Sequence, residues 1–251
     1  MSYKRVFGLV GKNIAYSFSR NYFAEKFDQL QLTDCNYRNF DLQEIQEFAP
    51  IFKEHKENLV GLNVTIPYKE MVAAYLDEID EDAANIGAIN TIKIDKDGKR
   101  KGFNTDVYGF SNSIKPFIKP IHKKALILGT GGASKAVAYA FKKMNIEYVF
   151  VSRVPKDAQQ ISYESLNEKI ISETHIIVNC SPIGTSPDIH LCPSIPYEFL
   201  SENHLLFDLI YNPDETTFLR KGKEKGAAIK NGYEMLELQA EKSWEIWNSE
   251  E

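Results

Sequence analysis

The sequence has few cysteines, no cluster of histidines and no long apolar run. Its 251 residues include three cysteines and five histidines. The cysteines, Cys35, Cys180 and Cys192, form no CxxC pair, which argues against a disulfide framework and favours a reducing, cytoplasmic compartment. The histidines show neither HxH nor HExxH spacing. The sequence therefore predicts no metal site.

The chain also lacks a membrane segment and an excess of positive charge. The apolar run in MSYKRVFGLVGKN is too short for a signal peptide, and no later run approaches the length that spans a bilayer. Thirty basic side chains stand against thirty-five acidic ones, a formal net charge of −5. This balance argues against nucleic acid or a membrane surface as a partner, although a local anion site remains open.

What the sequence does contain is typical of a folded α/β protein. Hydrophobic residues make up 43% and charged residues 26%, which is ordinary for a globular chain with sizeable cores. The length exceeds that of one usual core and favours two domains.

The first hundred residues predict a mixed sheet with helices. Residues 5–11 read as a buried strand, and Ser19 precedes a segment with apolar residues at helical spacing. A second helix is expected over 42–52, before a strand at 59–66. Two short strands flanking the Asp-Gly turn of DKDG predict a hairpin within 88–103.

From Asp106 the pattern becomes a helix to about residue 115 and then a regular alternation of strands and helices. This rhythm predicts a doubly wound parallel sheet. A closing helix at 234–247 has no strand behind it and is free to pack on the first domain. We therefore expect a mixed-sheet α/β domain of residues 1–105 plus 233–251 and a parallel-sheet domain of residues 106–232. The five strands expected in the second domain are 123–129, 147–153, 174–180, 204–210 and 226–230.

A glycine-rich loop joins a strand to a helix in LILGTGGASKAVAYAF. Gly129, Gly131 and Gly132 let the backbone approach a pyrophosphate, which helix amides then bind. Ser134 occupies the place of the third glycine in GxGxxG, so the fingerprint is incomplete. The loop predicts a Rossmann dinucleotide site; the alternative is a tight structural turn.

The next strand ends in Ser152 and Arg153, where NAD enzymes carry an acidic residue for the ribose 2′-hydroxyl. A guanidinium attracts a 2′-phosphate, and Lys156 follows closely. NADP is therefore preferred over NAD, the alternative being that Arg153 is a solvated cation.

A lysine follows the interrupted strand NVTIPYKE. The strand pattern breaks at Pro67, and Lys69 comes two residues later. Taken alone, Lys69 is more often a solvated strand-end residue than a catalytic ammonium.

Several motifs in one order resemble the shikimate dehydrogenase family over nearly the whole chain. They are GLVGKNIAYSFSRNYF, GLNVTIPYKE, NIGAINT, GFNTDVYGF, LGTGGASKA, NCSPIGT, DLIYNPDETTFLRKGKEKG and NGYEMLELQA. The resemblance implies reversible reduction of 3-dehydroshikimate to shikimate with NADPH, in aromatic amino acid (chorismate) biosynthesis.

The resemblance implies Lys69 and Asp106 as the catalytic pair. An ammonium can stabilise the alkoxide that forms when hydride reaches a carbonyl, and can deliver the proton. Asp106 would orient the lysine and hold a neighbouring hydroxyl.

The resemblance also implies the residues that bind the two ligands. Ser17 and Ser19, assisted by Tyr211, would bind the substrate carboxylate, while Asn63, Thr65, Asn90 and Gln239 would reach ring hydroxyls or order the pocket. Each has an ordinary structural alternative, such as Ser19 as a helix N-cap or Gln239 as a solvated helix residue. The cofactor would contact Gly129, Thr130, Gly131, Gly132, Ala133, Ser152, Arg153, Lys156, Ser181 and Gly232.

The chain departs from the family's pattern at several positions. Tyr16 stands where histidine is usual, Arg20 where proline is usual, and Thr185 where methionine is usual near the nicotinamide. Serine and valine flank Arg153 where asparagine and threonine are common, so NADP discrimination would rest mainly on one guanidinium. Arg20 could add a cation near the acid or simply face water. The linkers near Thr105 and Gly232 are expected to cross a cleft that closes on binding.

Three alternatives remain open on the sequence alone. One is a quinate/shikimate dehydrogenase with relaxed NAD or NADP use, and another is a non-catalytic ligand-binding paralogue. A third is a two-domain NADP enzyme acting on folate carriers, which the hydroxyl-rich site disfavours. The oligomeric state, monomer or homodimer, is not set by the sequence.

Overall fold

A computed structural model describes residues 4–15 and 17–249, and Tyr16 lies outside the described residues. The chain divides into two compact units, Met1–Thr105 with Ala240–Glu251, and Asp106–Gln239. Each unit has its own sheet and its own core. Within the described residues, no helix has the length and apolar character needed to cross a bilayer.

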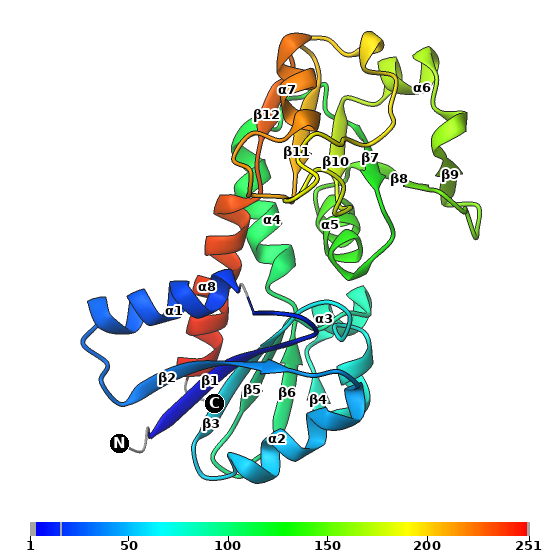
Figure 1. The fold of residues 1–251 in the computed structure, drawn as a ribbon. Coiled ribbons are helices and arrows are strands. Elements are labelled where there is room, and N and C mark those ends of the chain that lie inside the picture. The colour runs from blue at the N-terminus through cyan, green and yellow to red at the C-terminus, as the bar shows by residue number, and fades with distance from the viewer. Residues whose placement is uncertain (1–3, 16, 250–251) are drawn as a thin grey trace. The chain divides into compact units, whose positions relative to one another are not determined.

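The first unit is built on a mixed six-stranded sheet (Figure 1). Its strand order is β2-β1-β3-β5-β6-β4. Strands β1, β2 and β3 are parallel, β5 is antiparallel to both neighbours, and β4 is parallel to β6. The elements are β1 (Arg5–Gly11), α1 (Phe18–Gln29), β2 (Cys35–Asp41), η1 (Ile45–Glu47), α2 (Phe48–Glu54), β3 (Leu59–Val64), η2 (Met71–Tyr75), β4 (Glu78–Ile79), α3 (Glu81–Ile86), β5 (Thr91–Ile94) and β6 (Arg100–Phe103).

Both faces of this sheet are buried, and β1 shows why. Its residues alternate, so Val6 and Val10 pack on the side of η1, α2 and α3, while Phe7 and Leu9 pack on the side of α1. The second side is completed by α8 (Tyr233–Asn248), whose Trp247 ring lies 5.0 Å from that of Phe7. The expectation that the closing helix packs on the first domain is confirmed for its carboxyl-terminal part.

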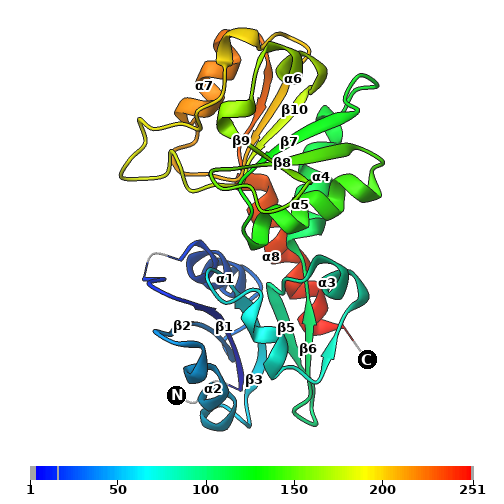
Figure 2. The ribbon, with the colours of Figure 1, turned by 90° about the vertical axis from the view of Figure 1, so that its right-hand side faces the viewer.

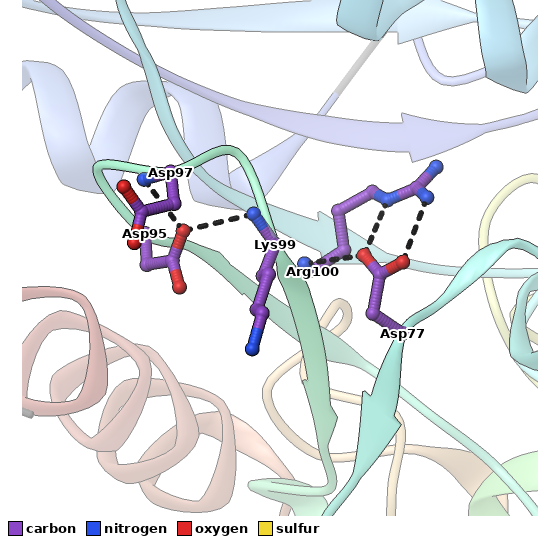
Figure 3. A network of polar contacts seen from close by, with 5 residues as sticks. All are labelled: Asp77, Asp95, Asp97, Lys99 and Arg100. Atoms are coloured by element: carbon purple, nitrogen blue, oxygen red, sulfur yellow. Dashed lines mark hydrogen bonds and ion pairs between the residues drawn. The ribbon is translucent and has the colours of Figure 1, made fainter.

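The hairpin predicted within 88–103 is confirmed as β5 and β6, and its turn is held by one carboxylate. Asp95 Oδ1 accepts from the backbone N–H groups of Asp97 and Lys99 at 2.9 and 2.8 Å. Beside the turn, the Asp77 carboxylate accepts from the Arg100 backbone and from two guanidinium nitrogens (Figure 3). The bidentate pair lowers the pKa of Asp77.

Three local predictions for this unit need correction. The helix expected over 42–52 is split into η1 and α2, and the predicted strand at 59–66 ends at Val64. Helix α1 is capped by Ser17 and not by Ser19, since Ser17 Oγ accepts from the N–H of Arg20 at 3.3 Å.

The second unit is an all-parallel six-stranded sheet with the order β12-β11-β10-β7-β8-β9. In chain order this is the 3-2-1-4-5-6 arrangement of a doubly wound Rossmann fold, so that prediction is confirmed. The elements are α4 (Asp106–Ile114), η3 (Lys115–Phe117), β7 (Lys124–Leu128), α5 (Gly132–Lys143), β8 (Glu147–Ser152), β9 (Gln160–Ser162), η4 (Tyr163–Ser165), α6 (Glu168–Glu173), β10 (Ile176–Asn179), η5 (Tyr197–Phe199), β11 (Leu205–Asp208), α7 (Thr217–Glu224) and β12 (Ala228–Lys230).

Helices cover both faces of the second sheet (Figure 2). Phe110 of α4 packs edge-on against Phe141 of α5 and Phe207 of β11 on one face. On the other face Ile171 of α6 and Phe218 of α7 join a core with alternate residues of β7, β10 and β11. Apart from its first turns, which belong to this unit, α8 belongs to the first.

Candidate active site

The site residues predicted in the first unit gather at one edge of its sheet. Strands β1, β3 and β6 end at this edge, and the antiparallel β5 begins there. The polar segments that carry the predicted residues lie directly beside these strand ends. They hold Ser17 and Ser19 after β1, Thr65 and Lys69 after β3, and Asn90 before β5.

The two predicted carboxylate-binding serines open helix α1. Ser17 is half-buried and caps the helix, while the Ser19 side chain is buried. Arg20 is exposed, in agreement with the alternative that it faces water. The first turn of α1 contains no acidic residue, so the helix dipole favours an anion here.

Lys69 is half-buried in the turn that follows β3. Its carbonyl oxygen accepts from the N–H of Ile89 at 2.7 Å, which ties the turn to the segment before β5. The neighbouring Tyr68 is buried, and its hydroxyl donates to the carbonyl of Leu42 at 2.8 Å. The backbone that carries the lysine is thus anchored on two sides.

Asn90 is held by Thr105, in the segment that follows β6. Its Oδ1 accepts from the N–H of Thr105 at 2.7 Å, and its Nδ2 donates to Thr105 Oγ1 at 3.0 Å. Asn90 N also donates to the carbonyl of Phe103, and Asn90 O accepts from Val64 N. The backbone of Asn90 is therefore that of a strand-end residue, in agreement with the structural alternative. Its side-chain amide is part of a buried cluster of polar groups.

Asn63 belongs to the same buried cluster. Its Oδ1 accepts from the phenol of Tyr37 at 2.8 Å, and its Nδ2 donates to Ser243 Oγ at 2.9 Å. Only 4% of Asn63 is exposed. Of the two roles predicted for Asn63, ordering the pocket fits this placement better than reaching a ring hydroxyl. Thr65 is half-buried, and its N–H donates to the carbonyl of Val10 at 2.8 Å.

Asp106, Tyr211 and Gln239 belong to the second unit. Asp106 is buried in the first turn of α4 and directly follows Thr105, so a peptide bond links it to the Asn90 cluster. Gln239 is also buried, which overturns the alternative of a solvated helix residue. Its Nε2 donates to the carbonyl of Leu236 at 2.8 Å. Burial raises the pKa of Tyr211.

The glycine-rich loop lies where the strand order of the second sheet reverses, between β7 and β10, and ligands of open α/β sheets bind at this switch point. Gly129 has a φ of 113°, a value that favours glycine. Gly131 has an ordinary backbone, and a Cβ built on it would have no neighbour within 4 Å. The lack of a side chain at Gly131 is thus not required by the packing of the described residues. It leaves room for a phosphate beside the first amides of α5, which have no intrahelical acceptor.

Ser134 explains the incomplete glycine fingerprint. It is fully buried, and its hydroxyl donates to the carbonyl of Gly131 at 2.6 Å. A serine is therefore accommodated in the first turn of α5, beside the predicted contacts Thr130, Gly132 and Ala133.

The carboxyl end of β8 presents the predicted 2′-phosphate residues. Arg153 and Lys156 are both exposed. The Ser152 hydroxyl closes a local turn, since it accepts from Val154 N and donates to Val154 O, each at 3.2 Å. Burial raises the pKa of the Tyr163 phenol, and the Arg153 charge opposes this rise.

Ser181 is positioned by two buried residues that the sequence analysis did not single out. Its N–H and its hydroxyl both donate to Asn179 Oδ1, at 3.0 and 2.7 Å. Asn179 Nδ2 in turn donates to Asp208 Oδ1 at 3.0 Å. The signal available in the sequence was a polar residue closing an apolar strand, in IIVNC and LLFDL. Thr185 lies on the exposed part of the same loop.

Gly232, predicted to contact the cofactor, has a structural reason to be glycine. A Cβ at this position would stand 2.1 Å from the carbonyl oxygen of Leu209. Its N–H donates to the carbonyl of Ile210 at 3.1 Å. No group of three or more His, Cys, Asp or Glu side chains suited to a metal occurs among the described residues.

Comparisons with known proteins show which family the chain is similar to. Residues 9–92 match the family model of the shikimate dehydrogenase substrate binding domain. A shikimate dehydrogenase (NADP(+)) from Methanosphaera stadtmanae is 35% identical, with 96% of this chain and 90% of that protein covered.

Two solved structures are also similar. One is shikimate 5-dehydrogenase from Thermus thermophilus in complex with NADP(H) and shikimate, with a TM-score of 0.85, 31% identity, and 97% of this chain and 93% of the other covered. The other is quinate dehydrogenase from Corynebacterium glutamicum in complex with NAD, with a TM-score of 0.86, 25% identity, and 98% and 94% covered. Full-length similarity at this level, together with the glycine loop and the polar sheet edge, establishes that the chain belongs to the shikimate dehydrogenase family.

Proposed function

We propose that this protein is an NADP-dependent shikimate dehydrogenase, which interconverts 3-dehydroshikimate and shikimate in the chorismate pathway. The observation that carries the proposal is similarity at 35% identity to a shikimate dehydrogenase (NADP(+)) along 96% of the chain. We assign substrate binding mainly to residues 1–105 and 233–251 and cofactor binding to residues 106–232.

The residues around the glycine loop fit a dinucleotide. The space beside Gly131 and the amino-terminal amides of α5 suit a pyrophosphate. The exposed guanidinium of Arg153 suits a 2′-phosphate, with Lys156 as a second cation. NADPH supplies the hydride when it is bound.

The edge of the first sheet suits a hydroxylated carboxylic acid. Ser17, Ser19 and the amino-terminal end of α1 would hold the carboxylate, with Tyr211 as a further donor. Asn90, Thr65 and Gln239 would bind ring hydroxyls, while Asn63 orders the pocket. Neutral amides and hydroxyls of this kind disfavour analogues that lack the matching groups, because buried polar atoms would then be left unpaired.

Lys69 acts as the proton donor and acceptor for the reacting oxygen. In reduction, hydride adds to the carbonyl carbon and the carbonyl oxygen gains the Lys69 proton, so the product is a secondary alcohol. In oxidation, the amine takes that proton back. Asp106 orients the ammonium and holds a neighbouring hydroxyl of the substrate.

A quinate dehydrogenase remains the second candidate, because a quinate dehydrogenase structure with NAD is similar over the full chain. Arg153 favours the NADP enzyme, since NAD has no 2′-phosphate for it to bind. Initial rates with shikimate and quinate, each with NADP and NAD, test the proposal. The highest kcat/KM is expected for shikimate with NADP, and a preference for quinate with NAD would contradict it.

A further inference from the structure

We propose that Tyr37 and Ser243 are positioning residues for substrate binding, because they hold Asn90 in place through one buried chain of hydrogen bonds. This inference rests on the proposed function, in which Asn90 binds a ring hydroxyl. Neither Tyr37 nor Ser243 needs to touch the substrate. Each would act through the side chains that it holds.

The first part of the chain runs from strand β2 to strand β3. The Tyr37 phenol donates to Asn63 Oδ1 at 2.8 Å. Asn63 Nδ2 lies 3.3 Å from the carbonyl of Asn90, which can only accept. This contact fixes the orientation of the Asn63 amide, so the phenol proton must point to Asn63.

Ser243 of α8 forms the middle of the chain. Its Oγ accepts from Asn63 Nδ2 at 2.9 Å and lies 2.8 Å from Thr91 Oγ1. It also lies 3.2 Å from Thr105 Oγ1. A residue from the closing helix thereby joins strand β3, strand β5 and the segment that follows β6.

The chain ends on the side-chain amide of Asn90. Thr91 Oγ1 donates to Asn90 Oδ1 at 3.1 Å, and Thr105 N donates to the same atom at 2.7 Å. Asn90 Nδ2 donates to Thr105 Oγ1 at 3.0 Å. The residue expected to bind a ring hydroxyl, Asn90, is therefore held by bonds that lead back to Ser243 and Tyr37.

Burial makes this arrangement rigid. Thr91 and Ser243 are fully buried, and Tyr37 is 6% exposed. Water cannot readily replace a lost partner, so removal of one hydroxyl leaves a buried donor or acceptor unpaired. Burial also raises the pKa of Tyr37, which keeps the phenol protonated and its donor role constant.

The role of Tyr37 is to hold the Asn63 amide in one orientation. Its phenol is the donor from which Asn63 Oδ1 accepts. Loss of the phenol hydroxyl would leave Asn63 Oδ1 short of a donor, and the amide could then turn away from Ser243 and from the carbonyl of Asn90.

The test uses Tyr37→Phe and Ser243→Ala in the full chain, with steady-state kinetics for both substrates. Each variant is expected to raise the KM for shikimate about 3- to 10-fold, the equivalent of one lost hydrogen bond. The kcat should stay within about twofold and the KM for NADP should not change, because the reacting groups and the cofactor site are not altered.

Matched controls separate positioning from general stability. Tyr37→Phe keeps the ring stack on Phe23, whose centroid lies 4.7 Å away. Tyr197→Phe removes a comparable tyrosine bond, 2.8 Å long, to the carbonyl of Pro193 in the other unit, and should leave the KM for shikimate unchanged. Ser243→Thr restores a hydroxyl and should recover most of the loss caused by Ser243→Ala.

The double variant Tyr37→Phe with Ser243→Ala tests whether the bonds form one chain. Its KM increase is expected to be smaller than the product of the two single increases. Active variants with an unchanged KM for shikimate would overturn the inference alone. A parallel fall in kcat and in cofactor affinity, with no rescue by Ser243→Thr, would also overturn it. A wild-type protein without shikimate turnover would instead overturn the proposed function.

Discussion

Asp208 Oδ2 accepts a 2.6 Å hydrogen bond from the hydroxyl of Thr216, and both residues are fully buried. Asp208 Oδ1 accepts from Asn179 Nδ2 and from the backbone N–H of Ile210. Burial outweighs these three bonds and raises the pKa of Asp208 to about 6. Burial thus destabilises the ionised form of Asp208, and the same carboxylate holds Asn179, which in turn holds Ser181.

The stability of the protein should therefore depend on Asp208 near neutral pH. The pKa of Asp208 is higher in the folded chain than in the unfolded chain. The stabilisation of the fold by protonated Asp208 is therefore fully present below the unfolded pKa of 3.8 and is lost as pH rises through 6. As pH falls from 8 to 5, the free energy of unfolding of the wild type should rise by about 1 kcal/mol relative to that of Asp208→Asn.

Urea unfolding of both proteins at pH 5, 6, 7 and 8 measures this difference. Groups that are unchanged by the substitution, such as the buried His122, whose pKa burial lowers, cancel in the comparison. A difference that is independent of pH would show that Asp208 does not titrate in this range.

Gly131→Ala should weaken cofactor binding without loss of stability. The added methyl meets no protein atom within 4 Å, and the backbone of Gly131 (φ −82°, ψ −178°) suits any residue. The methyl would instead stand where a phosphate approaches the amides of α5. We expect the Kd for NADP to rise roughly tenfold or more, because charge-assisted bonds weaken as they lengthen.

Gly222→Ala is the matched control. Its Cβ would lie 2.4 Å from Leu206 Cδ2, so it should lower the melting temperature, with no direct effect on NADP. Fluorescence titration and thermal unfolding of both variants separate the two effects. If Gly131→Ala lowered stability and left the Kd unchanged, the loop would be a structural turn.

Arg153→Ala should shift the cofactor preference toward NAD. Loss of a charge-assisted bond to a 2′-phosphate costs about 1.5–3 kcal/mol, or roughly 10- to 100-fold in kcat/KM for NADP. The value for NAD should hardly change. Lys156→Ala serves as the comparison and should have a smaller effect of the same sign. Equal losses with both cofactors would refute recognition of the 2′-phosphate by Arg153.

Lys69→Ala should lower kcat by about 10²- to 10⁴-fold, the usual contribution of a general acid or base. NADP binding should be retained, because Lys69 lies in the first unit and the glycine loop in the second. Steady-state rates and cofactor titration provide the two measurements. A variant with nearly wild-type kcat would remove Lys69 from the chemistry.

Local sequence patterns were sufficient for much of the fold. Strand β1 matches its predicted residues 5–11, and all five strands predicted in the second unit are present. These strands are apolar runs bounded by turn residues, so their signal is local. Strand β2 was missed because CNYRNFD is rich in polar residues. Strand β9 was missed because it has only three residues at a sheet edge.

Less of the candidate site than of the fold could be predicted from the sequence. Local patterns predicted the glycine loop between a strand and a helix, and the structure has it between β7 and α5. Lys69 lies in the turn after β3, and Asn90 lies just before β5. The pairing of Asn63 with Ser243 was not predicted, because the two residues are 180 positions apart and neither has a local pattern that marks a contact. Asn179 and Asp208 meet only because β10 and β11 are neighbours in the sheet. Such pairs depend on the tertiary fold, which local periodicity does not encode.

The central claim is tested most directly by the initial rate of absorbance change at the NADPH band when purified protein is mixed with shikimate and NADP. The proposal predicts saturable formation of NADPH, with a higher kcat/KM than for quinate or for NAD. No formation of NADPH from shikimate, under conditions where the protein binds NADP, would contradict it.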